Sequence, residues 1–131
     1  MNPEDYVSYP LALALKKAGF NEPCDHYWYK VYTDSDKMEM RQASADDYNN
    51  DDWSVPHCSA PHIYHAQKWL REKGIDIEIR VWIVGNEREY RPYIMPPKCR
   101  DFIAYPPKKL YESALSAGIA AALELINNEN K

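Results

Sequence analysis

The stretch that decides the fold is Ile75-Asp76-Ile77-Glu78-Ile79-Arg80-Val81-Trp82-Ile83-Val84, which alternates like a β-strand. Apolar β-branched residues fill the odd positions from 75 to 83, and Asp, Glu, Arg and Trp fill the even positions up to 82. Because successive side chains of a strand point to opposite faces, the pattern predicts one buried face and one partly wet face. Gly85-Asn86 is a turn signal, and residues 88–95 are the expected hairpin partner. Pro92 should place that partner at an edge or a bulge.

A helix is predicted directly before this strand. Ser59 is its expected N-cap, Pro61 lies in its first turn, and Gly74 supplies the left-handed residue that ends it. Its apolar stripe comprises Ile63, Ala66 and Leu70, with Trp69 beside it.

Two further helices flank this central part. The first is predicted over 9–18, with Ser8 as N-cap, and Gly19 should end it so that Phe20 folds back onto Leu15. The last should start after Pro106-Pro107 and run to about residue 127, with a broad face of small residues suited to close packing on a sheet.

An earlier strand pair is predicted at 26–33 and 37–41, joined by Asp34-Ser35-Asp36, and a short strand is expected at 102–105. Tyr29 should face the core and Trp28 the opposite side, while 42–58 resembles a solvated loop. The order α-β-β-α-β-β-(β)-α predicts one α+β domain over residues 1–131. It should contain an antiparallel sheet of about four to five strands and three helices.

Composition limits the function classes. The 131 residues are 45% hydrophobic and 27% charged, which is typical of one globular domain. No apolar run reaches the roughly 18 residues of a membrane helix, and the acidic start Met1–Asp5 lacks a signal-peptide layout. Three cysteines without close pairs favour free thiols in a reducing compartment, so we expect a cytoplasmic protein. The net charge of −4 argues against non-specific nucleic-acid binding, which needs a cationic surface.

Short segments along nearly the whole chain carry a family resemblance. They are Gly19-Phe20-Asn21-Glu22-Pro23-Cys24, Ala60-Pro61, Gln67-Lys68-Trp69-Leu70-Arg71-Glu72-Lys73 and Tyr111-Glu112-Ser113-Ala114-Leu115. In these segments the chain resembles a family of small proteins from gut bacteria of the Bacteroides type and from their phages or mobile elements. Because the segments are helix ends and core positions, the resemblance implies a bacterial, phage or mobile-element context rather than a reaction.

The sharpest chemical constellation is a group of imidazoles and thiols. It comprises His57, Cys58, His62 and His65, with Cys24 and His26 as a second half. Both group types are zinc ligands, and His62 and His65 would share one helix face. The paired spacings of structural zinc sites, such as C-x2-C, are missing from the sequence, so exposed or packed histidines are favoured and no cofactor is predicted.

The related enzyme hypothesis uses Cys58 as a nucleophile. This residue would precede a helix N-terminus, where the helix dipole lowers the pKa of a thiol. No Gly-rich turn accompanies it, and the four glycines of the chain form no phosphate-binding loop. A small metal- or cysteine-dependent enzyme is therefore the alternative, and a protein without catalysis is favoured.

The aromatic content is the strongest functional hint. Eleven Tyr and four Trp exceed what one small core needs, and these side chains dominate interface hot spots, although Tyr also suits half-exposed strand positions. The sequence favours a binding or accessory protein that contacts an unidentified protein through a polar-aromatic sheet face. That face should be lined by Trp28, Tyr32, Trp82 and Tyr93. Nucleic-acid binding through Arg80, Arg88 and Arg91 is a weaker alternative, and a homo-oligomer is left open.

Overall fold

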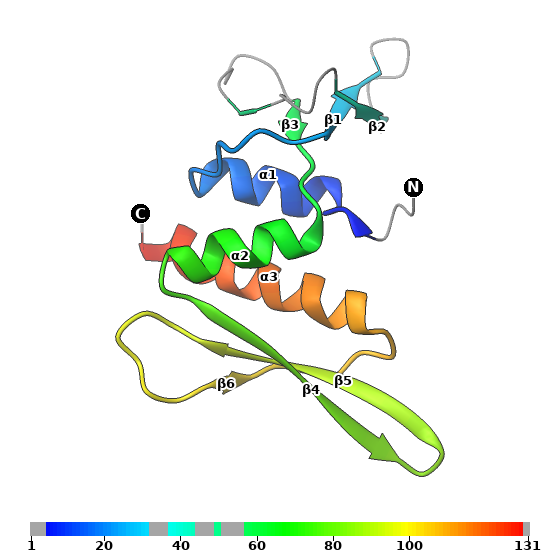
Figure 1. Ribbon diagram of the computed structural model, residues 1–131, viewed down its shortest axis with the longest axis vertical. Helices are drawn as coiled ribbons and strands as arrows, with labels where there is room; N and C mark the ends of the chain where they lie inside the picture. Colours follow the sequence, from blue (N-terminus) through cyan, green and yellow to red (C-terminus); the bar gives the residue numbers. More distant parts are fainter. Residues whose placement is uncertain (1–4, 32–36, 44–48, 51–56, 130–131) are drawn as a thin grey trace. The chain divides into compact units, whose positions relative to one another are not determined.

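The computed structural model describes residues 5–31, 37–43, 49–50 and 57–129 (Figure 1). Its contacts divide the chain into two compact units, 1–62 and 63–131, and each unit is described by itself. The elements are α1 (Tyr9–Lys17), β1 (His26–Lys30), β2 (Met38–Gln42), β3 (Cys58–Ser59), α2 (Ile63–Glu72), β4 (Asp76–Val84), β5 (Glu87–Met95), β6 (Ile103–Ala104) and α3 (Tyr111–Glu129).

The α+β class is confirmed, but the strands of the described residues form two sheets instead of one. Both are three-stranded and antiparallel, with the orders β2-β1-β3 and β4-β5-β6. Each predicted hairpin has a two-residue strand, β3 or β6, as its third strand, and the two hairpins belong to different sheets. The single domain over 1–131 stays a prediction.

Helix α1 ends as its sequence predicts. Gly19 has a φ of 100°, the left-handed region that favours glycine. The Phe20 N–H donates to the Leu15 carbonyl at 2.9 Å and the Gly19 N–H to the Lys16 carbonyl at 3.1 Å. This is a Schellman closure, and it places the Phe20 ring in the core, where it is fully buried. Ser8 stands at the N-cap, as predicted, but its side chain makes no capping hydrogen bond.

Strand β1 is turned over relative to the prediction. Trp28, expected opposite the core, lies on the side that carries α1, where its ring meets Tyr9 edge-on at 6.2 Å. Its indole Nε1 donates to the Val7 carbonyl at 3.0 Å, which satisfies the polar atom of the ring. Tyr29, expected to face the core, instead lies under the Arg41 guanidinium, 3.8 Å from its ring centroid. The segment before α1 therefore covers Trp28, an arrangement that the alternation within β1 does not reveal.

Asn50 corrects the expectation that 42–58 is a solvated loop. Its side chain is buried and fully used: Nδ2 donates to the Phe20 carbonyl and to Ser59 Oγ, both at 2.8 Å. Its Oδ1 accepts the Ser59 N–H at 2.8 Å. Ser59 is thus a strand residue bound to Asn50, and the prediction that it caps the second helix is wrong. The predicted turn at 34–36 lies outside the described residues.

Unit 63–131 begins with α2, which starts at Ile63 and ends at the predicted place. The Ile75 N–H donates to the Leu70 carbonyl at 3.0 Å, and Gly74 has a φ of 90°. Strand β4 follows at once and pairs with β5 without interruption from Asp76 opposite Met95 to Val84 opposite Glu87. The decisive strand and its hairpin are therefore confirmed.

Helix α3 packs directly on this hairpin. It starts at Tyr111, after Pro106-Pro107 as predicted, and Lys108 before it bridges to Tyr90 of β5. A Cβ added to Gly118 would lie 3.0 Å from Ile77 Cγ2 and 3.3 Å from Pro92 Cβ, so this glycine allows a close approach of helix and sheet. The prediction that small residues suit α3 for close packing is confirmed at Gly118.

Pro92 lies in the central strand of its sheet and not at the predicted edge. Its carbonyl accepts the Tyr105 N–H at 3.0 Å, and a residue's N–H and C=O point to the same side of a strand. The N–H that proline lacks would therefore point toward the third strand and not toward β4. The third strand, β6, comprises Ile103–Ala104 and ends beside Pro92. A proline is tolerated here because its missing donor falls where the ladder stops.

Candidate functional site

The turn end of the β4–β5 hairpin, residues 79–90, extends past α3 and is called the hairpin arm below (Figure 1). On the face toward the helices, Ile77 is 9% exposed, Val81 51% and Ile83 70%. Helix α3 therefore covers the base of this apolar row and leaves its far half exposed. Val81 and Ile83 thus continue the apolar row beyond the core of this unit.

The opposite face of the hairpin, called the outer face, combines aromatic and charged groups. Arg80 donates from Nε to Glu78 at 2.6 Å, and its guanidinium carbon lies 4.1 Å from the Tyr93 ring centroid. The hydrogen bond to Glu78 is the first cause of a raised Arg80 pKa. Trp82 is next along this face and is 52% exposed. Two predicted site residues, Trp82 and Tyr93, thus share one face, with Arg80 stacked on the Tyr93 ring.

The segment before α3 braces the arm. Tyr90 and Lys108 exchange two backbone hydrogen bonds of 2.8 Å, and the Tyr90 ring meets Tyr111 edge-on at 5.9 Å. Near the turn, Lys109 Nζ lies 2.6 Å from Glu87 Oε2, a contact that lowers the pKa of this carboxyl. These contacts hold the arm as an ordered ribbon and so reduce the conformational entropy lost when a partner binds it.

The other two predicted face residues do not join this group. Trp28 belongs to the sheet β2-β1-β3, and its indole is hydrogen-bonded within unit 1–62. Tyr32 lies outside the described residues. The condition for a shared face, that the strand of Trp28 lies in the same sheet as Trp82, is not met.

The imidazole and thiol groups have mostly separate neighbours, but His26 and His62 share one: their rings lie 4.4 Å and 5.6 Å from that of Tyr6. The His57 ring lies 4.4 Å from that of Tyr29, and His65 belongs to α2. Within 5–31, 37–43, 49–50 and 57–129, no three His, Cys, Asp or Glu side chains are grouped as ligands for one metal ion.

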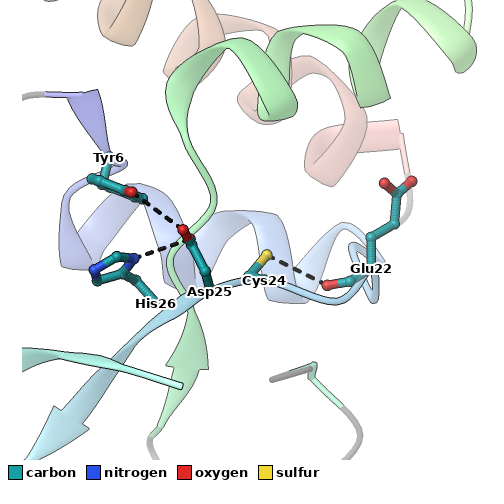
Figure 2. Close-up of polar contacts among 5 residues, drawn as sticks. All are labelled: Tyr6, Glu22, Cys24, Asp25 and His26. Carbon is teal, nitrogen blue, oxygen red and sulfur yellow. Dashed lines mark hydrogen bonds and ion pairs between the residues drawn. The ribbon is translucent and has the colours of Figure 1, made fainter. Parts of the chain in front are cut away.

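Figure 2 shows the second half of the predicted constellation. Cys24 Sγ points toward the Glu22 carbonyl at 3.4 Å, whereas His26 Nδ1 faces Asp25 Oδ1 at 3.0 Å. The hydrogen bond from His26 is the first cause of a lowered Asp25 pKa. The Tyr6 hydroxyl completes this contact by donating to Asp25 Oδ2 at 3.4 Å. Thiol and imidazole thus have separate partners.

The thiols of Cys24 and Cys58 are poor nucleophiles. Burial raises the pKa of each to about 12, and the nearby Lys16 ammonium lowers that of Cys58 only in part. Because the thiolate is the reactive form, neither group is activated near neutral pH. The sequence-based reason for a low pKa fails because Cys58 is a buried residue of β3 and does not precede a helix directly.

The three arginines of the nucleic-acid alternative do not form one patch. Arg80 is opposite Arg91 on the outer face, and Arg88 is opposite Ile83 on the helix-side face. Glu87 and Glu89 share the outer face with the first two, opposite Val84 and Trp82. Mixed signs within the arm give a weaker attraction to phosphate than a continuous basic row would.

The sequence missed two features of this region. The alternation predicts that Ile83 is buried, but alternation cannot show where the helix that covers a strand ends. The sequence also missed Lys108, whose bridge to Tyr90 braces the arm. The extended pair Pro106-Pro107 before it is the signal that a helix is delayed there.

The chain was compared with protein-family models, curated proteins and solved structures. No protein-family model, curated protein or solved structure matches the chain. Across the described residues, none of the helices is long and apolar enough to cross a bilayer.

Proposed function

We propose that this protein is a non-catalytic binding or accessory protein that recognises another protein with its hairpin arm. The observation that carries the proposal is the run Val81-Trp82-Ile83-Val84, whose four side chains are each between 51% and 70% exposed. Consecutive residues of a strand face opposite sides, so the run presents apolar surface on both faces of the ribbon. Apolar surface gathered in this way is typical of an interaction site.

The neighbouring groups suit a protein partner. Trp and Arg are enriched among the residues that dominate interface energies, and Trp82 lies next to Arg80 on the outer face. Glu87 and Glu89 lie on the same face near the turn and supply a polar rim of opposite sign. An apolar centre with a mixed-charge border favours a protein surface over a phosphate backbone.

The proposal includes the bacterial, phage or mobile-element origin that the resemblance implies and the cytoplasmic location inferred from the cysteines. The alternative of a metal- or cysteine-dependent enzyme at His57, Cys58, His62 and His65 is less favoured. Its two key requirements, a grouped ligand set and a thiol with a low pKa, find no support in the described residues.

The test compares three forms of the protein as immobilised bait in extracts of cells that carry the gene. Trp82→Ala should lose at least about thirtyfold in affinity for the retained partner if Trp82 is a hot spot worth 2 kcal/mol. Tyr64→Ala is the matched control, because Tyr64 is an aromatic residue of similar exposure, 47%, on α2. A Trp82→Ala bait that retains the same proteins as strongly as the wild type would refute the proposal.

A further inference from the structure

The backbone of β4 has polar groups directed away from its own sheet. Tyr90 uses both its N–H and its C=O on Lys108, on the far side of β5, so neither is directed at its cross-strand neighbour Val81. In an antiparallel pair such a position is the non-hydrogen-bonded type, and Val81 therefore points its own N–H and C=O outward. Ile79, opposite Pro92, and Ile83 share this orientation because the pattern repeats every second residue.

Part of this outward row is already occupied within unit 63–131. Gln67 Nε2 of α2 donates to the Ile77 carbonyl at 3.1 Å, which caps the row at its base. Beyond that point β4 is the edge strand in the sheet order β4-β5-β6 of the described residues. Among the described residues, Ile79, Val81 and Ile83 therefore form the uncapped part of the edge.

This edge lacks the protection that monomeric proteins give to exposed strands. Natural edges carry prolines, bulges or several charges, which discourage pairing with another chain. Residues 79–84 contain one charge, Arg80, and neither proline nor glycine. Their register with β5 is one-for-one and thus free of bulges. The uncapped edge is suited to receive a strand.

Resting on the proposed function, we infer that the partner of the hairpin arm is a second copy of this chain, which adds its own β4 antiparallel to the first. A two-fold axis at Val81 places Val81 of one copy opposite Val81 of the other. It also places Ile79 of each copy opposite Ile83 of the other. The outward N–H and C=O groups then meet their equivalents, and the two three-stranded sheets become one of six strands. Closed two-fold dimers of this kind are the commonest homo-oligomers.

The axis at Val81 is favoured over axes at Ile79, Arg80 and Trp82 for the three reasons below. An axis at Arg80 would place two guanidinium groups directly opposite each other, which is destabilising. An axis at Ile79 would require the Ile77 carbonyl, which Gln67 occupies. An axis at Trp82 would place Ile79 opposite Gly85 and remove one apolar pair. Val81 is the centre that satisfies both the backbone and the side chains.

The same register gives complementary contacts on the outer face. Arg80 of one copy lies opposite Trp82 of the other, where a guanidinium can stack on the indole. Glu89 flanks Trp82 on its other side, as its partner on β5, so each such row runs from acid to aromatic to base. On the helix-side face, Ile79, Val81 and Ile83 of both copies lie side by side in one apolar row, so that contacts across the pair remove part of their surface from water.

Sedimentation velocity of the full chain over a hundredfold concentration range tests the inference. The wild type should have twice the monomer mass, and Val81→Lys and Val81→Glu should each be monomeric because they place like charges at the axis. An equimolar mixture of the two variants should restore the dimer, since Val81 pairs with its own equivalent. Val81→Thr is the matched control and should remain dimeric. Far-ultraviolet circular dichroism of each variant checks that it is folded.

The outcomes separate the inference from the proposed function. A wild type that is monomeric at every concentration, a folded Val81→Lys that stays dimeric, or a mixture that stays monomeric would each overturn the inference. A monomeric wild type that captures a different protein through Trp82 overturns the inference and leaves the proposed function standing. Equal capture by the wild type and Trp82→Ala refutes the proposed function, whatever the mass.

Discussion

Trp28 and Trp82 each lie within a strand, yet Trp28 is partly covered by its own unit and Trp82 is exposed. The Trp28 indole is hydrogen-bonded to Val7 and packed against Tyr9, whereas Trp82 is 52% exposed. In unit 1–62 the segment leading into α1 covers its strand, while in unit 63–131 helix α3 covers only the base of the hairpin. The comparison teaches that alternation defines two faces and that neighbouring elements decide which face is buried.

The largest effect is expected where unit 1–62 depends on a single polar side chain. Asn50→Ala removes the partners of the Ser59 N–H and the Phe20 carbonyl, which stay buried. Losing three buried hydrogen bonds of the Asn50 side chain at once should lower the free energy of unfolding by about 3–5 kcal/mol, measured by urea denaturation. Asn128→Ala, at an exposed position of α3, is the control and should change stability little. A loss below that of ordinary surface substitutions would show that Asn50 is not a structural centre.

Trp28→Ala is the next largest change and tests the partly covered half of the comparison. It removes the hydrogen bond to Val7 and the packing on Tyr9, so the free energy of unfolding should fall by about 3 kcal/mol. Trp28→Phe keeps most of the ring contact and should lose about 1 kcal/mol, the worth of the hydrogen bond. Equal losses for Ala and Phe would mean that the indole N–H, and not the packing, anchors the strand.

Gly118→Ala tests how tightly α3 holds the base of the hairpin. The added methyl group would lie 3.0 Å from Ile77 Cγ2 and 3.3 Å from Pro92 Cβ, closer than normal van der Waals contact. We expect overpacking to lower the free energy of unfolding by about 1–2 kcal/mol, despite the better helix propensity of alanine. Thermal denaturation measures the loss, and a stabilised variant would show that helix and sheet can move apart at this point.

The smallest effect is expected at Trp82. Because its ring lies outside a packed core, Trp82→Ala should change the free energy of unfolding by no more than about 0.5 kcal/mol, measured in denaturant at a concentration that keeps the chain monomeric. A loss of about 3–5 kcal/mol would show instead that a second packed layer covers this face, and it would remove the basis for a binding role.

The sequence predicts those parts of the fold that depend on local rules. Gly19 and Gly74 end their helices as expected, and the alternation from Ile75 onward gives strand β4 and its hairpin. Long-range contacts were not predictable: the burial of Asn50 depends on Ser59 and Phe20, and the orientation of Trp28 depends on Val7. For the site, Trp82 and Tyr93 lie on one face of the hairpin, and their role in binding stays a prediction. The exposure of Val81 and Ile83 was not predictable because it depends on where α3 stops covering the hairpin.

Pro92 has a consequence for how far a sheet of this kind can grow. Edge-to-edge pairing leads to fibres when both outer strands of a subunit accept another chain. Here the second edge is β6, which has two residues and ends beside a proline that cannot donate. Pairing through β4 therefore leaves a short edge at each end of the enlarged sheet, too short to template another strand. If two chains pair through β4 as inferred above, the two-residue length of β6 limits further growth of this sheet.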